Sequence, residues 1–347
     1  MNEPRRKHIF IAEEEYGLPY SKGLAASSLM VTGLSPAKAY AIANKVEEEL
    51  RLVGDATVTN ERLRKLTLDV LRRDAGERYA EAFIKWQSVA RLDIPLIILL
   101  GGGTGVGKST IATQLASRLG ITRVVSTDAV REVLRSAFTK EMFPTLYSSS
   151  FEADREIRQP IPHSGDRLII GFREQAAAVA VGAQALIDRA IEEGTDMILE
   201  GAHLVPGFLE KIESDQAVIV PLLVTIDDEE LHRSHFYRRG RDSNLRGHDR
   251  YLNAFKKIRR IQKYMISSAA MRNVPQVEHY DLDATLTEII DHVITKALET
   301  VERGIPLEEA DGALLDQAVE VVGRQREQAQ RTAEEAATAG TRREQHA

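Results

Sequence analysis

Two kinds of apolar spacing alternate along the chain between residues 94 and 300. Short runs of consecutive apolar residues, typical of strands buried on both faces, recur at intervals. Between the runs, apolar residues return every three or four positions, as in helices with one buried face. Strands that alternate with helices predict a parallel sheet flanked by helices, which is an α/β fold. The predicted strands cover residues 96–100, 123–126, 196–200, 218–226 and 277–280.

The longest helical pattern covers residues 165–193 and predicts a single helix. The fourth strand is less regular, because Pro221 lies inside it and cannot donate a hydrogen bond to a neighbouring strand. A shorter strand over residues 222–226 is therefore an alternative. The apolar stripe expected along the long helix consists of Ile169, Phe172, Ala176, Val179, Ala183, Leu186 and Ala190.

Residues 1–93 predict a separate, small and mainly helical domain that ends at Asp93-Ile94-Pro95. Serine or threonine before a helical pattern, or proline in its first turn, marks three helix starts. These starts lie near Ser21, at Ser35-Pro36 and at Thr59 or Asn60, and a fourth helix is expected over about residues 77–90. The second helix is expected to bury Tyr40, Ala43, Val46 and Leu50.

The apolar pattern weakens past residue 300. Residues 306–322 predict one more helix, and residues 323–347 are polar and lack large apolar side chains. A segment of that composition cannot bury enough apolar surface to fold, so it predicts a disordered tail. The expected organisation is a domain over 1–93, a second over 94–300 and a helical extension with a tail over 301–347.

Composition narrows the range of functions. The chain has no cysteine, which excludes disulfides and thiolate metal sites and is typical of a cytoplasmic protein. The N-terminus does not have the pattern of a secretory signal, and no apolar run approaches the roughly 20 residues that span a bilayer. A net charge of −6 argues against general nucleic-acid binding. We expect a cytoplasmic protein without membrane or nucleic-acid partners, and the sequence leaves a homo-oligomer open.

The first strand of the α/β region runs directly into a glycine-rich motif with the spacing Gly102-x-x-x-x-Gly107-Lys108-Ser109. Helical apolar spacing follows, so the motif has the strand–loop–helix context of a phosphate-binding loop rather than of a chance glycine turn. Its amides can approach phosphate oxygens, Lys108 can reach the β- and γ-phosphates, and Ser109 can bind Mg²⁺. ATP and Mg²⁺ are therefore the expected cofactors. The predicted nucleotide-binding residues are Gly102, Gly103, Thr104, Gly105, Val106, Gly107, Lys108, Ser109 and Thr110.

A second candidate group follows the second predicted strand. Asp128 lies where the next helix would begin, and Arg131 comes one turn later. Asp128 is either a helix cap or a general base that accepts a proton from a substrate hydroxyl. We favour the base, because this strand end should lie beside the phosphate-binding loop. Arg131 would then bind an anionic group of the substrate.

A third group follows the buried strand that ends in Glu200-Gly201-Ala202-His203. Glu200 resembles the acid that positions Mg²⁺ in enzymes with a phosphate-binding loop, and the alternative is a surface acid at a strand end. Ser109 and Glu200 are thus the predicted metal residues. His203 is as well explained by capping or packing as by function.

Basic residues are concentrated between residues 233 and 263, with eleven Lys or Arg against two acids. Arg238, Arg239 and Arg241 are predicted to form a mobile arginine segment that closes over the transferring phosphoryl group. In that assignment Arg238 and Arg239 act in catalysis beside Lys108 and Asp128, and Arg241 binds substrate beside Asp128 and Arg131. A solvated basic face is the interpretation for Lys256, Lys257 and Lys263. Nucleic-acid binding is a weaker alternative, because interleaved aromatic residues are lacking.

Four stretches together resemble the ATP-dependent 2-phosphoglycerate kinase family. They are residues 19–42, the loop at 101–110, Ser-Thr-Asp-Ala-Val-Arg at 126–131, and Leu-Glu-Gly-Ala-His-Leu-Val-Pro-Gly at 199–207. The resemblance spans roughly residues 7–300. It implies a P-loop kinase domain preceded by a helical domain similar to the ATP-cone, a nucleotide-binding regulatory module.

The resemblance further implies transfer of the γ-phosphoryl group of ATP to 2-phosphoglycerate, a small phosphorylated acid, giving 2,3-bisphosphoglycerate. Three alternatives stay open from the sequence. The acceptor could be another phosphorylated small molecule, such as an inositol phosphate, or a polynucleotide end. The chain could also be an ATP-binding regulatory protein without turnover.

Overall fold

A computed structural model describes residues 10–13, 16–53, 57–89, 94–209, 214–242 and 248–302. The chain divides into two compact units, Met1–Asp93 with Val301–Ala347, and Ile94–Thr300. The helix predicted over 306–322 and the tail predicted over 323–347 lie outside the described residues. No described helix has both the length and the apolar character needed to cross a bilayer.

Over its described residues the first unit combines a small sheet with four helices. Its strands are β1 (Phe10–Glu13), β2 (Tyr16–Pro19) and β3 (Thr57–Thr59), in the order β2-β1-β3. β1 is antiparallel to β2 and parallel to β3. The helices are α1 (Lys22–Met30), α2 (Pro36–Val53), α3 (Asn60–Asp74) and α4 (Glu77–Val89).

The predicted helix starts in this unit are correct, but one predicted core residue is wrong. Ser21 caps α1 and Thr59 caps α3, each accepting a hydrogen bond from a backbone N–H three residues on. Tyr40 was expected in the core and is 47% exposed. The buried face of α2 is centred near Ala39 and not near Tyr40, so the Tyr40 side chain lies at the edge of that face. The buried residues of α2 include Ala39, Ile42, Ala43, Val46 and Leu50.

The second unit contains a five-stranded parallel sheet in the order β5-β6-β4-β7-β8. All five predicted strands are present, and β4 is the central strand. Because all are parallel, their carboxyl ends share one edge of the sheet, which is where such sheets bind ligands. The strands are β4 (Leu96–Gly102), β5 (Arg123–Ser126), β6 (Met197–Gly201), β7 (Val218–Thr225) and β8 (Gln276–Glu278).

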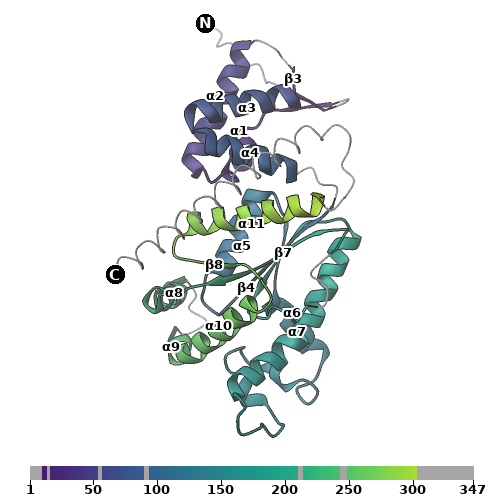
Figure 1. The fold of residues 1–347 in the computed structure, drawn as a ribbon, viewed down its shortest axis with the longest axis vertical. Helices are drawn as coiled ribbons and strands as arrows, with labels where there is room; N and C mark the ends of the chain where they lie inside the picture. The colour runs from purple at the N-terminus through teal and green to yellow at the C-terminus, as the bar shows by residue number, and fades with distance from the viewer. Residues whose placement is uncertain are drawn as a thin grey trace, which may run out of the picture. The chain divides into compact units, whose positions relative to one another are not determined.

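Helices cover both faces of this sheet. In Figure 1, α5 and α11 lie on one side, and α7 and α10 lie on the other. Ile97 and Leu99 of β4 pack with Ala183 and Ile187 of α7 in one buried cluster, as alternate residues of a strand share a face. The helices are α5 (Lys108–Leu119), α6 (Thr127–Ala137), α7 (Arg167–Glu192), α8 (Glu229–Asp242), α9 (His248–Asn253), α10 (Phe255–Ala270) and α11 (Leu282–Glu302), with short 3₁₀ turns η1 (Pro144–Tyr147) and η2 (Ala153–Glu156).

Strand β7 continues through Pro221, so the shorter alternative is wrong. The N–H of Val218 donates to Pro95 O beside β4, and the N–H of Leu223 donates to Pro275 O on the opposite side, beside β8. Since N–H groups alternate sides along a strand, residue 221 would point its N–H toward the β8 side. Described pairing with β8 begins only at Leu223, so no ladder hydrogen bond is lost at Pro221.

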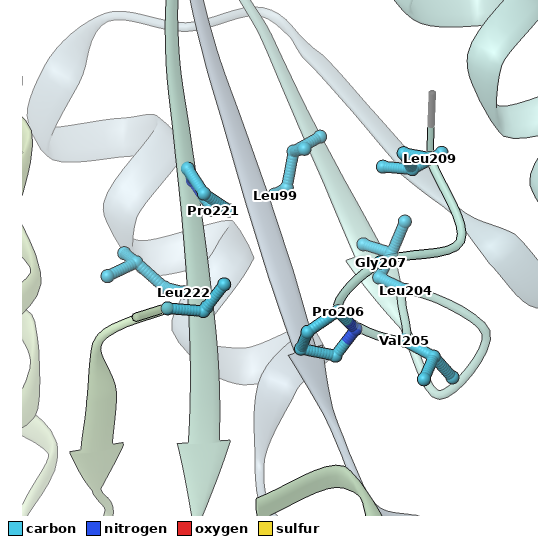
Figure 2. A pocket seen from close by; sticks show the side chains of 9 residues that line it. Leu99, Leu204, Val205, Pro206, Gly207, Leu209, Pro221 and Leu222 are labelled. Atoms are coloured by element: carbon cyan, nitrogen blue, oxygen red, sulfur yellow. The ribbon is translucent and has the colours of Figure 1, made fainter. Parts of the chain in front are cut away.

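A small apolar cavity of about 20 Å³ lies where the chain folds back over the sheet after β6. Figure 2 shows Leu204, Val205 and Pro206 on one side of it, with Leu99 of β4 and Pro221 of β7 on the other. Its apolar lining offers nothing to hold a charged ligand, and a phosphorylated substrate is far larger. The cavity is therefore not a candidate site.

Candidate active site

The glycine-rich loop leaves the central strand and enters α5, in the predicted succession of strand, loop and helix. Gly105 and Gly107 have φ angles of +87° and +89°, in the left-handed region that favours glycine. A Cβ atom on Gly105 would lie 2.3 Å from the ring of Phe236, and one on Gly107 would lie 2.9 Å from the ring of His279. Both glycines are therefore required by backbone conformation and by close neighbours.

Two side chains at the start of α5 are held at the carboxyl edge of the sheet. Lys108 is only 8% exposed, and its Nζ donates to Gly103 O at 2.8 Å, so it lies folded into its own loop. Ser109 Oγ donates to Glu200 Oε1 at 2.8 Å. Glu200 is 7% exposed and lies at the end of β6, beside β4. The two residues predicted to bind the metal are thus in contact.

Gly201, which follows Glu200, allows the start of α6 to approach β6. It has a φ of +155°, and a Cβ there would overlap the Thr127 hydroxyl at 1.7 Å. Thr127 Oγ1 in turn lies 2.9 Å from His203 Nδ1, and His203 Nε2 lies 3.1 Å from Gln175 Oε1. The residues of the Glu-Gly-x-His segment therefore contact α5, α6 and α7 in turn.

The hydrogen bonds determine which nitrogen of His203 carries the proton. Gln175 Nε2 donates to the carbonyls of Thr145 and Ser148, so Gln175 Oε1 faces His203 as an acceptor. His203 Nε2 must then donate, and Nδ1 accepts from the Thr127 hydroxyl. Burial lowers the pKa of His203 to about 4, with smaller contributions from Arg131 and Lys108, while Asp128 opposes the shift. His203 is a neutral link between α6, α7 and the η1 turn.

Asp128 does not cap α6, which was the alternative to its predicted role as a general base. The cap of α6 is Ser126, whose Oγ accepts from the Ala129 N–H at 3.1 Å. The Asp128 side chain is 73% exposed, and its Oδ1 lies 3.7 Å from Arg131 Nε. Asp128 is therefore a solvent-accessible carboxylate in the first turn of α6, after the strand that pairs with β6, and its role as a base stays a prediction.

Arg131 donates hydrogen bonds to backbone carbonyls of the protein, whereas its predicted role is to bind an anionic group of the substrate. Its Nη1 donates to Leu146 O at 3.1 Å and to Ser148 O at 2.8 Å, and its side chain is 14% exposed. Arg131 therefore holds the η1 turn against α6. Its role in substrate binding stays a prediction. The Arg131 Nε is the group that lies beside Asp128, the candidate base.

Several bases of the basic segment form ion pairs with acids of the insertion between α6 and α7. Residues 138–166, between α6 and α7, supply acids to the bases of α9 and α10. Lys257 Nζ lies 2.8 Å from Asp154 Oδ2, and Arg260 Nη2 lies 2.5 Å from Asp166 Oδ2. Arg250 pairs with Glu152 in the same way. The solvated role expected for Lys257 is therefore wrong, whereas Lys256 and Lys263 are exposed as predicted.

Helix α8 contacts the phosphate-binding loop through residues that the sequence did not single out. His232 Nε2 lies 2.9 Å from Thr104 O, and His235 Nδ1 lies 2.9 Å from Gly105 O. Phe236 is fully buried beneath Gly105. Arg238, Arg239 and Arg241 lie in the last turns of α8, and their side chains are outside the described residues. The arginine segment therefore stays a prediction, attached to a helix whose first half is anchored.

The predicted metal residues suit Mg²⁺ bound with a nucleotide. Among the described residues no group of three or more His, Cys, Asp or Glu could hold a metal by itself. Mg²⁺ usually binds through one or two protein oxygens together with phosphates and water, rather than in an all-protein cage. The Ser109 hydroxyl and the Glu200 carboxylate, in contact beside the loop, are such a pair.

Fold and site together define the class of protein. A parallel sheet whose central strand runs into Gly-x₄-Gly-Lys-Ser, with a carboxylate on the serine and a second at the next strand end, has the architecture of the P-loop kinases.

Comparison with curated proteins narrows the class to a family. A 2-phosphoglycerate kinase of Pyrococcus furiosus is 42% identical over 286 residues, which cover 82% of this chain and 93% of that protein. The 2-phosphoglycerate kinases of Methanocaldococcus jannaschii and Methanopyrus kandleri are 38% and 35% identical, over 84% and 85% of this chain and 93% and 90% of theirs. The chain belongs to the 2-phosphoglycerate kinase family. No protein-family model matches it.

Solved structures resemble the chain only distantly. A shikimate kinase from Acinetobacter baumannii is 16% identical with a TM-score of 0.33, covering 63% of this chain and 99% of that one. A gluconokinase from Sinorhizobium meliloti is 12% identical with a TM-score of 0.32, covering 60% and 95%. Scores this low carry no argument about the site.

Proposed function

We propose that the chain transfers the γ-phosphoryl group of ATP to 2-phosphoglycerate and so forms 2,3-bisphosphoglycerate and ADP. The observation that supports it is the contact between Ser109 and Glu200 beside the loop, with the exposed carboxylate of Asp128 at the neighbouring strand end. The choice of acceptor is supported by the name shared by relatives up to 42% identical.

In this proposal the loop amides from Gly102 to Thr110 and the Lys108 ammonium bind the phosphates of ATP. Lys108 would exchange its bond to Gly103 O for phosphate oxygens. Ser109 and Glu200 would hold Mg²⁺, which neutralises phosphate charge when bound.

Asp128 acts on the acceptor. It accepts the proton of the 2-phosphoglycerate hydroxyl as that oxygen bonds to the γ-phosphorus, and the bond to the β-phosphate oxygen breaks to release ADP. Arg131, Arg238, Arg239 and Arg241 are the proposed ligands of acceptor and transferring phosphates. A cytoplasmic location, the oligomeric state and regulatory nucleotide binding by the first unit stay predictions.

An acceptor screen with γ-labelled ATP and Mg²⁺ tests the proposal. The acceptors are 2-phosphoglycerate, 3-phosphoglycerate, glycerate, inositol phosphates and oligonucleotide ends. We expect the highest kcat/KM with 2-phosphoglycerate and a product labelled on its new phosphate. Faster transfer to another acceptor would replace the substrate and keep the kinase. Tight ATP binding without transfer to any acceptor would instead favour a regulatory protein.

A further inference from the structure

We propose that α8 orients the peptide groups of the phosphate-binding loop from behind, with His232 and His235 as positioning residues. The inference rests on the proposed function in one respect, that the loop binds the phosphates of ATP. It assigns a role to two histidines in a segment whose sequence pointed only to its arginines.

The donors and acceptors of both contacts are unambiguous. A carbonyl oxygen only accepts, so His232 Nε2 carries a proton and donates to Thr104 O, and His235 Nδ1 carries a proton and donates to Gly105 O. Both distances are 2.9 Å, an ordinary length for such bonds. The two histidines are three positions apart and therefore lie on the same face of α8.

Each carbonyl belongs to a peptide group whose N–H points the opposite way. The peptide unit is planar and trans, so the direction of its C=O determines the direction of its N–H. The bond to Thr104 O therefore orients the N–H of Gly105, and the bond to Gly105 O orients the N–H of Val106. In a phosphate-binding loop these N–H groups must converge on the phosphate, and their carbonyls must point outward.

Three successive carbonyls of the loop accept side-chain hydrogen bonds. Gly103 O accepts from Lys108, Thr104 O from His232 and Gly105 O from His235. Lys108 belongs to the loop itself and has a role toward phosphate. The two histidines come from another element, α8, and bond to different carbonyls than Lys108 does. They therefore hold the outer turn of the loop independently of the ligand.

The environment of His232 favours the form that donates from Nε2. The side chain is fully buried, and within the described residues its Nδ1 has no hydrogen-bond partner. A proton on Nδ1 would thus be buried without an acceptor, which is costly. Burial is also the main reason that the pKa of His232 is lowered to about 4.

Helix α8 is anchored well enough to act as a support. Phe236 has no exposed surface and stacks on Tyr251, with ring centroids 5.2 Å apart and planes at 10°. The His232 ring stacks on Phe236 at 5.4 Å and meets Phe255 edge-on at 5.3 Å. These contacts connect the loop, through α8, to the core cluster formed with α9 and α10.

Matched substitutions in the full-length chain test the role. The amide nitrogen of glutamine can take the position of Nε2, and that of asparagine the position of Nδ1. His232→Gln and His235→Asn therefore keep the donor, whereas His232→Asn and His235→Gln misplace it and His232→Leu and His235→Leu remove it. Ser234→Ala is the control, because Ser234 is exposed on the same helix and its hydroxyl donates to Leu231 O one turn earlier.

Binding is measured by calorimetry with ATP and with inorganic tripolyphosphate, without an acceptor. We expect each variant with a misplaced or removed donor to bind ATP and tripolyphosphate about 10-fold more weakly. This is the effect of losing one well-aligned hydrogen bond from a loop N–H to a charged phosphate. The donor-keeping variants and Ser234→Ala should stay near the wild-type affinity. In turnover assays the same variants should raise the KM for ATP more than they lower kcat.

The design separates the possible failures. Equal affinities for the glutamine and asparagine variants at one position would overturn the positioning role, even if the leucine variants do not fold. Wild-type affinity in the leucine variants would overturn it as well. A wild-type chain that binds neither ATP nor tripolyphosphate would overturn the proposed function itself, since the loop would then have no phosphate to bind.

Discussion

The two halves of the candidate site differ in how firmly their key groups are held. On the nucleotide side Lys108 is 8% exposed and bonded to Gly103 O, and Ser109 is bonded to a buried Glu200. On the acceptor side Asp128 is 73% exposed, with Arg131 Nε 3.7 Å away. Both halves lie at the same sheet edge, separated by β6. The side chains of the predicted phosphate-binding half are thus held by protein partners, whereas the Asp128 carboxylate of the predicted acceptor half is exposed to solvent.

This difference implies an order of events. A loop whose backbone is already held in place costs little to occupy, so nucleotide binding would require only that Lys108 and Ser109 exchange their present bonds to Gly103 O and Glu200. A hydrated carboxylate becomes an effective base for the acceptor only when water is displaced, which requires the acceptor and a covering segment. We therefore expect substitutions on the nucleotide side to affect binding of ATP, and those on the acceptor side to affect turnover.

The largest effect is expected on the nucleotide side, at Lys108. Lys108→Ala should reduce kcat/KM by on the order of 10³, because an ammonium aimed at the phosphates is lost. Circular dichroism and thermal unfolding should show a folded chain, and Lys256→Ala, an exposed lysine of α10, is the matched control. Near-normal transfer by Lys108→Ala would remove the loop from the mechanism.

A smaller but still large effect is expected on the acceptor side. Asp128→Asn should keep ATP affinity near normal and lose at least ~100-fold in kcat, as typical for removal of a general base. Glu288→Gln, which neutralises an exposed carboxylate of α11, should change little. Turnover that survives in Asp128→Asn would show that the exposed carboxylate does not act as the base.

Glu200→Gln changes the carboxylate at the end of β6, the strand that lies between the two halves. It should raise the Mg²⁺ concentration needed for half-maximal rate by about tenfold, the order found when a metal's supporting carboxylate is altered. A Mg²⁺ titration of both acid variants makes the comparison. Rescue of Asp128→Asn by extra Mg²⁺, with no rescue of Glu200→Gln, would reverse the two assignments.

The last expected effect concerns stability instead of activity, and it is a pH dependence that comes from the buried histidines. His203 and His232 have pKa values lowered to about 4 in the folded chain, against about 6.5 when unfolded. Between these values the unfolded chain binds protons that the folded chain does not, so stability is lost as pH falls from 6.5 toward 4. The slope is about 1.4 kcal/mol per pH unit for each histidine.

Urea unfolding at pH 7, 6 and 5 measures this slope. His203→Gln, which cannot titrate, should lower the slope of stability against pH by the contribution of one histidine, about 1.4 kcal/mol per pH unit. An unchanged slope would mean that His203 is protonated in the folded chain, and the hydrogen-bond direction assigned through Thr127 and Gln175 would be wrong.

Much of the kinase unit could be predicted from its sequence because the signals are local. The five strands follow from apolar runs, and the loop follows from glycines placed between a strand and a helix. The strand predicted over 218–226 is present as β7, and only the shorter alternative that Pro221 suggested is wrong, since a proline's cost depends on what lies across from it. The cap of α6 was assigned to Asp128 as an alternative, although Ser126 two positions earlier serves.

The contacts that support the site could not be predicted in the same way. His232 and His235 meet the loop across 128 and 130 positions of sequence, and nothing in their own neighbourhood marks those partners. The insertion before α7 has no regular apolar spacing, so its ion pairs with α9 and α10 had no signal. Gln175 did leave one, as a polar residue on the buried stripe of α7, where a satisfied hydrogen-bond partner is required.

The position of Pro221 has a consequence beyond the register of β7. Strand β8 is three residues long and pairs with β7 only from Leu223 onward. The earlier part of that edge would otherwise present a free N–H at position 221, a template for a strand from another molecule. A proline there removes the donor, and so it disfavours edge-to-edge association while the chain folds.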